Sequence, residues 1–155
     1  MATDDRVKHR LGNALVGLQF ALIGLLAWTA WPAFMSNQVP TGAWVVFASG
    51  LLFGAWALAT NRPGNFNISP SPRTGARLVQ QGPYRWVRHP MYTAVLAAGC
   101  ACAWASASVW AWGAWVALVA VLVVKASLEE RWMQQVHPSY AAYRQGTRWF
   151  LPWIA

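Results

Sequence analysis

The chain has 155 residues, about the length of one domain; 57% of them are hydrophobic and only 10% are charged. Soluble domains contain about 45–50% apolar and about 25% charged residues, so this composition excludes an ordinary soluble protein and indicates a protein of the lipid bilayer. The net charge is +8, and the basic residues that produce it lie between long apolar runs. Proteins that bind nucleic acid carry their basic residues on a solvated face, so we expect membrane lipids, and no nucleic acid, as partners.

Four apolar runs predict an all-α integral membrane protein with four transmembrane helices in a single membrane domain, residues 1–155. The first run begins after Arg10 and is longer than the core of a signal peptide, so we expect it to remain as an anchor. It should end at Pro32, after about the 20 residues that cross roughly 30 Å of hydrocarbon. The spans are expected at about residues 11–31, 43–60, 90–105 and 109–125.

The third and fourth runs predict a closely packed helical hairpin. Pro90 suits the first turn of a helix, where its missing N–H has no intrahelical partner. The small residues 106–108 allow a tight turn, and the fourth run continues without Gly or Pro to Val136. We therefore expect the fourth helix to project beyond the membrane and to end at His137, which precedes a proline.

The charged residues determine the expected topology. They lie before the first run, in the loop 61–89, and from Lys125 through the tail 126–155, whereas the two remaining connections carry no charge. Short cytoplasmic loops carry the excess of Lys and Arg, so we expect both termini in the cytoplasm. For so short a chain we expect the bacterial inner membrane, and any chemistry should lie at its cytoplasmic face.

The segment Gly82–Tyr92 holds the densest group of functional side chains. It leads into the third helix, whose N-terminal N–H groups, together with Arg88 and His89, would suit a carboxylate or a phosphate. The alternative is that these basic and aromatic residues only anchor the helix in the headgroup layer. His89 and Tyr92 are three positions apart on one helical face, where a buried polar group without a partner is costly.

A second cluster follows the fourth apolar run and consists of Lys125, Glu129 and Glu130. Lys125 and Glu129 are four positions apart, so an ordinary ion pair on the helix surface is one interpretation. Two adjacent acids near anionic headgroups and at the C-terminal part of a helix are unfavourable by themselves. A cationic ligand would explain them better.

Together these residues resemble a known superfamily. GPYRWVRHPMY, followed after a hydrophobic hairpin by a lysine, the pair EE and then HPSYAAYR, is similar to the isoprenylcysteine carboxyl methyltransferases and phospholipid methyltransferases. The resemblance covers about residues 77–152 and implies a membrane enzyme that uses S-adenosylmethionine. By position, the implied cofactor-binding residues are Ala76, Arg77, Leu78, Val79, Tyr84, His89, Pro90, Met91, Tyr92 and Glu129.

The resemblance leads to a hypothesis for each cluster. Arg88, His89 and the helix N-terminus would receive the carboxylate of S-adenosylmethionine, and Glu129 its ammonium or ribose hydroxyls. Tyr84 or Tyr92 would lie against the sulfonium. We expect the catalytic residues to be Lys125, Glu129 and Arg88, and we expect no metal.

The acceptor stays open between a carboxylate, an amine and a thiol, on a small or lipophilic molecule that enters from the bilayer. In the carboxyl methyltransferases an arginine at the position of Lys125 is associated with the acceptor, and lysine lacks its bidentate geometry. Similar motifs occur in sterol reductases, so a nicotinamide-dependent membrane reductase is one alternative. A non-catalytic lipid-binding subunit is another. The C-terminal tail is expected to be either a lid on the cofactor or a surface anchor.

Overall fold

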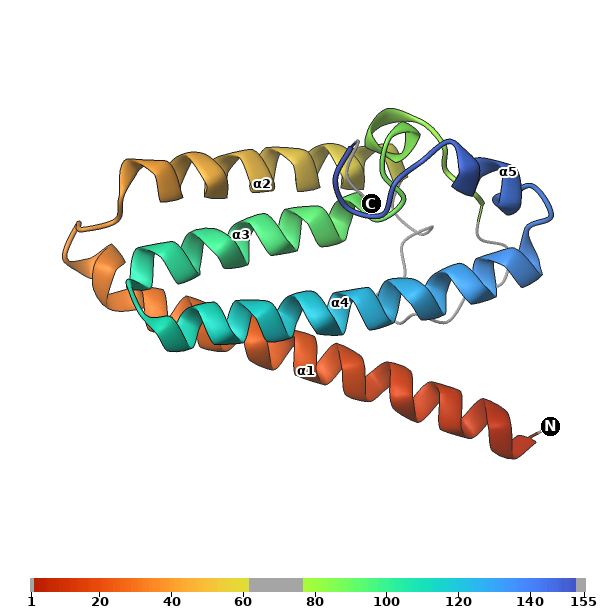
Figure 1. Cartoon of the computed structure of the whole chain (residues 1–155), viewed down its shortest axis with the longest axis horizontal. Helices are drawn as coiled ribbons and strands as arrows, with labels where there is room; N and C mark the ends of the chain where they lie inside the picture. Colours follow the sequence, from red (N-terminus) through yellow and green to blue (C-terminus); the bar gives the residue numbers. More distant parts are fainter. Residues whose placement is uncertain (1, 62–76, 153–155) are drawn as a thin grey trace.

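The computed structural model describes residues 2–61 and 77–152, with side chains described from Arg10 onward. The predicted all-α class is confirmed. In chain order the elements are α1 (Ala2–Met35), α2 (Thr41–Asn61), the 3-10 turn η1 (Gly82–Arg85), α3 (Pro90–Ser106), α4 (Val109–Val136) and α5 (Tyr140–Gln145). Figure 1 shows α2, α3 and α4 running alongside one another, with α1 crossing them at a slant.

Helix α1 is longer than expected at both ends. The expectation that it ends at Pro32 was wrong, because the helix continues through this proline to Met35. Proline removes one backbone donor, but the following turn is still closed, since the Ser36 N–H donates to the Pro32 carbonyl at 3.0 Å. The hydroxyl of Ser36 donates to the same carbonyl at 2.8 Å.

Small residues bring α2 and α3 into close contact. A Cβ atom added at Gly50 would lie 2.8 Å from the Cβ of Ala97 and 3.2 Å from the carbonyl oxygen of Ala94. One added at Gly54 would lie 3.0 Å from the Cβ of Ala94. Spacing of small residues by four allows two membrane helices to approach closely, so these glycines fix α2 against α3.

The predicted hairpin of the third and fourth helices is confirmed in its main features. Helix α3 begins at Pro90, and Ala107 adopts the left-handed conformation (φ 50°) in the tight turn that follows it. Helix α4 runs unbroken to Val136, and His137 ends it in an extended conformation. The apolar core between the helices contains Leu26 of α1 and Leu118 and Leu122 of α4.

Within the described ranges, three helices are long and apolar enough to cross a membrane: α1 from residue 10, α2, and α4. Helix α3 has only 17 residues, so the fourth span stays a prediction, as does the side of the membrane on which the termini lie. In Figure 1 the connections α1–α2 and α3–α4 lie at one end of the bundle. At the other end lie η1, α5 and the end of α4, and we call this the polar end of the bundle.

Candidate active site

The turn η1 is fixed against the end of α2. Gly82 has φ +56°, and a Cβ atom added there would lie 2.6 Å from the hydroxyl oxygen of Thr60, so both conformation and space require glycine. The indole rings of Trp56 and Trp86 meet edge to face at 5.7 Å. Tyr84, within η1, is therefore held at a defined position beside the end of α2.

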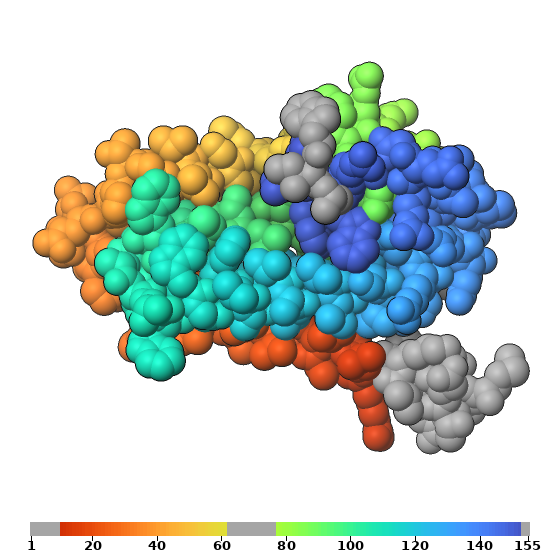
Figure 2. All heavy atoms as spheres, viewed as in Figure 1, coloured from red at the N-terminus to blue at the C-terminus, as the bar shows by residue number. Residues whose placement is uncertain are grey.

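Residues after η1 pair with the C-terminal segment 147–150, which we call the strap. The N–H of Arg88 donates to the carbonyl of Arg148 at 2.7 Å, and the N–H of His89 donates to that of Trp149 at 3.1 Å. In return the N–H of Arg148 donates to the Trp86 carbonyl at 3.0 Å. The strap ends on α3, where the Thr93 hydroxyl donates to the Phe150 carbonyl at 2.6 Å. Figure 2 shows the dark-blue C-terminal part of the chain lying along the second half of α4 and against the green turn.

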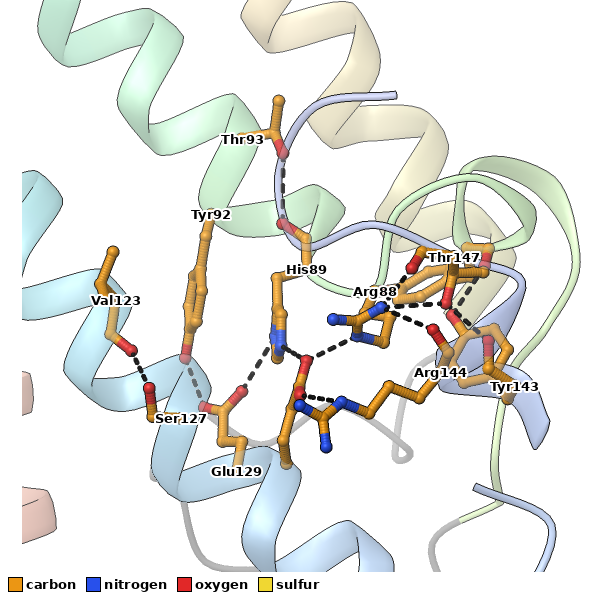
Figure 3. Close-up of polar contacts among 12 residues, drawn as sticks. Arg88, His89, Tyr92, Thr93, Val123, Ser127, Glu129, Tyr143, Arg144 and Thr147 are labelled. Atoms are coloured by element: carbon orange, nitrogen blue, oxygen red, sulfur yellow. Dashed lines mark hydrogen bonds and ion pairs between the residues drawn. The ribbon is translucent and has the colours of Figure 1, made fainter. Parts of the chain in front are cut away.

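The structure brings His89, Tyr92 and Glu129 together across α3 and α4 (Figure 3). The Tyr92 hydroxyl donates a hydrogen bond to Oε1 of Glu129. The Nδ1 atom of His89 lies 3.4 Å from Oε2 of the same carboxylate. The rings of His89 and Tyr92 are stacked, with centres 5.4 Å apart and planes at 6°. His89 is the N-cap of α3 and its backbone is not helical (φ −122°, ψ 58°), so the expectation that the two residues share one helical face was wrong, although their side chains do meet.

Glu130, which the sequence placed in the acidic cluster but not among the expected catalytic or cofactor-binding residues, lies at the centre of an ion-pair network. Its Oε1 atom is 2.5 Å from Nε of Arg88, and its Oε2 atom is 3.3 Å from Nε of Arg144. Arg88 also donates to the Thr147 carbonyl in the strap. The side chains of Arg88 and Glu130 are only 6% and 4% exposed. This buried network therefore joins the residues after η1 to α4 and to the C-terminal tail.

The two acids therefore have different surroundings. The Glu129 side chain is 21% exposed and lies beside aromatic rings, whereas Glu130 is enclosed by guanidinium groups. Adjacent positions on a helix point about 100° apart, which explains why neighbours in sequence have different partners. Only Glu129 is accessible enough to meet a ligand.

The site also shifts the pKa values of its turn residues. Burial lowers the pKa of His89, but its contacts with the Glu129 and Glu130 carboxylates outweigh that effect, so the pKa lies above the ordinary value of 6.5. The second contact runs from Nε2 to Oε1 of Glu130 at 3.4 Å. With a carboxylate at each ring nitrogen, the imidazolium is favoured. Burial raises the pKa of Tyr84 to about 12, so that its phenol stays neutral.

Lys125 lies one turn before Glu129 and is 1% exposed. Its Nζ atom donates to Oε1 of Gln19 on α1 at 2.6 Å. The same atom lies 5.3 Å from the centre of the Tyr92 ring, within the range of a cation–π interaction. Gln19 is 6% exposed and is a further residue that sequence reasoning missed.

The other predicted site residues precede η1 in the chain, lie within it, or begin α3. Ala76 is outside the described residues; Arg77 is exposed, Leu78 and Val79 are half-buried, and Pro90 is buried. The Tyr84 carbonyl accepts a hydrogen bond from the Tyr143 hydroxyl at 2.6 Å. The structure thus joins Tyr84 to the tail, and joins Tyr92 and His89 to Glu129.

These surroundings suit a ligand with a cationic part and hydroxyl groups. A partly exposed carboxylate can pair with an ammonium or accept from a diol, and the adjacent rings of Tyr92 and Phe150, 6.3 Å apart, provide aromatic faces for a cation. S-Adenosylmethionine has these chemical groups. The residues present therefore fit it.

Comparison with known proteins agrees with this chemistry. The model of the phospholipid methyltransferase family matches residues 41–139, which is more than half of the chain and includes α2, η1, α3 and α4. In the comparisons with curated proteins and with solved structures, nothing matches. Members of the family are enzymes that use S-adenosylmethionine, which decides against both the reductase and the non-catalytic alternative. The chain belongs to the phospholipid methyltransferase family.

Proposed function

We propose that this protein transfers a methyl group from S-adenosylmethionine to the amine of a phospholipid headgroup at the membrane surface. The observation that carries the proposal is the contact of Tyr92 on α3 and of His89, the N-cap of α3, with Glu129 on α4, at the polar end of an apolar helix bundle. A polar cofactor can reach this position from water. A lipid can reach it from the bilayer.

Cofactor binding is assigned to the accessible face of this cluster. Glu129 pairs with the ammonium or the ribose hydroxyls, and Tyr84 or Tyr92 offers its ring to the sulfonium. The described residues 77–79 and 89–91 are assigned to the remaining cofactor contacts, as the resemblance implies; Ala76 lies outside the described residues. When bound, S-adenosylmethionine supplies an electrophilic methyl group, so the protein needs to contribute orientation and the exclusion of water.

Arg88 and Lys125, the other expected catalytic residues, are assigned supporting roles. The guanidinium of Arg88 is held by Glu130 and by the strap. Lys125 is enclosed by Gln19 and Tyr92. Both therefore act on the site through their neighbours, and Glu129 is the member of the three that meets ligands.

The acceptor is assigned from its chemistry. The family is one of phospholipid methyltransferases. Of the nucleophiles considered, an amine is the one that the ethanolamine headgroup of membrane phospholipids carries. A headgroup amine also lies at the depth where apolar helices give way to charged residues, which is the depth of Glu129.

The test is methyl transfer in defined vesicles. The protein is reconstituted into phosphatidylethanolamine vesicles with radiolabelled S-adenosylmethionine, and lipids are extracted and separated. We expect label in mono- and dimethylated phosphatidylethanolamine. Vesicles of phosphatidylglycerol, which has the phosphate but no amine, are the matched control and should remain unlabelled. Absence of label in both lipids, from protein that binds the cofactor, would contradict the proposed acceptor.

A further inference from the structure

A polar contact joins α1 to α4 inside the apolar part of the bundle. Lys125 of α4 donates to Gln19 of α1 at 2.6 Å, and the two residues are 1% and 6% exposed. Helix α1 precedes the residues 41–139 that match the family. The contact therefore connects a helix outside that match to the helix that carries Glu129.

Both groups are costly at this position unless each is held by a partner. An amide or an ammonium removed from water loses its solvation, and this is unfavourable unless a hydrogen-bond partner replaces the water. The amide oxygen of Gln19 offsets part of this cost for Lys125 and restricts where its Nζ atom can lie. Leucine or methionine would fill the same space without this cost, so packing does not explain the pair.

The position of Lys125 matters because its Nζ atom lies over the Tyr92 ring, at 5.3 Å from the ring centre. The hydroxyl of that ring donates to Glu129. A chain of contacts thus runs from Gln19 through Lys125 and Tyr92 to the carboxylate. Each link is a direct contact between two side chains, and together the links involve α1, α3 and α4.

We infer that Gln19 is a positioning residue of the methyl-transfer site and that α1 completes this site. Gln19 acts through Lys125, whose ammonium holds the Tyr92 ring in the orientation that binds Glu129. The inference rests on the proposed cofactor site. It adds that the affinity of this site depends on a side chain that no ligand contacts.

The experiment is calorimetric titration of S-adenosylhomocysteine into the full chain in nanodiscs. Gln19→Leu removes the amide at nearly constant volume, and we expect it to weaken binding about tenfold, within the usual range for residues that act at a distance. Gln19→Glu keeps an oxygen acceptor for Lys125 and should restore affinity to within about threefold of wild type. In a Lys125→Met background, Gln19→Leu should have no further effect. Thr29→Val, which removes a hydroxyl bound to the Leu26 carbonyl within α1, is the matched control and should bind as wild type.

The outcomes are separable. Wild-type affinity in Gln19→Leu, or effects of Gln19→Leu and Lys125→Met that simply add, would overturn the inference and leave the proposed function standing. The same holds if Gln19→Glu fails to restore binding while all variants keep wild-type melting temperatures. A wild-type protein that does not bind S-adenosylhomocysteine would instead contradict the proposed function, and this inference with it.

Discussion

At the scale of single residues, two adjacent acids on one helix perform different tasks. Glu129 meets a tyrosine hydroxyl and an imidazole and stays partly open to solvent. Glu130 is enclosed between Arg88 and Arg144. The first is therefore suited to bind a ligand, and the second to hold the tail against the bundle.

Replacing each acid by glutamine separates these tasks. Glu129→Gln should lower the affinity for S-adenosylhomocysteine by about tenfold or more, since a hydrogen bond to a charged group contributes about 1.5–3 kcal/mol, with little change in melting temperature. Glu130→Gln should destabilise the protein by about 3 kcal/mol, because it leaves buried guanidinium charge uncompensated. Calorimetry and thermal unfolding in nanodiscs measure both. Each variant is the control for the other, and equal effects of the two would contradict the division.

His89 predicts a pH dependence of stability. Its folded pKa is raised above 6.5, so its stabilising contribution is fully present below about pH 6.5 and is lost as pH rises through the folded pKa. The difference in melting temperature between wild type and His89→Gln should therefore shrink as the pH is raised above about 6.5. A difference that stays constant or grows over this range would show that the imidazolium does not stabilise the fold.

Some of these residue contacts could be predicted from sequence and others could not. His89, Tyr92 and Glu129 could be predicted mainly because the motif resembles a known family. The helical spacing that also favoured His89 and Tyr92 does not apply, since His89 is the non-helical N-cap of α3. The task of Glu130 depends on Arg88 and Arg144, which the chain brings together only through tertiary folding. Gln19 could have been identified from the sequence, because it is a polar side chain inside an apolar membrane helix, where such groups are costly and often functional.

At the scale of elements, the strap is the part of the fold that local patterns could not predict. Its pairing with residues after η1 is made by backbone hydrogen bonds, which carry no side-chain signature. Long apolar runs, by contrast, predicted the helices closely, because burial in lipid requires each segment to satisfy its own backbone. The exception was Pro32, where a helix tolerated a residue expected to end it.

The strap should be measurably protected. The amides of Arg88, His89 and Arg148 donate to backbone carbonyls, so we expect slow hydrogen exchange at these positions in nanodiscs. Thr93→Val removes the hydroxyl that binds the Phe150 carbonyl and should speed exchange at Arg148 several-fold. As a control, Ser49→Val removes a hydroxyl bound to the Val45 carbonyl within α2 and should have no effect there. Exchange at Arg148 as fast as in an exposed peptide would contradict the pairing.

At the scale of the whole molecule, the bundle separates an apolar body from a polar end. The two short connections lie at one end, and η1, the strap and the acidic part of α4 lie at the other (Figure 1). This arrangement brings the arginine-rich turn and the acidic pair together although they are far apart in sequence. The proposed cofactor site therefore lies beside apolar helices, three of which, among the described residues, are long enough to cross a membrane.

The central claim is that Tyr92 and Glu129, from two helices, form one cofactor site. It is tested most directly by a double-mutant cycle of S-adenosylhomocysteine affinity with Tyr92→Phe, Glu129→Gln and the double variant, measured by calorimetry in nanodiscs. We predict that each single variant weakens binding and that the double variant is weaker by clearly less than the product of the two effects, with a coupling of about 1 kcal/mol or more. Fully additive effects, or wild-type affinity in all three variants, would contradict the account.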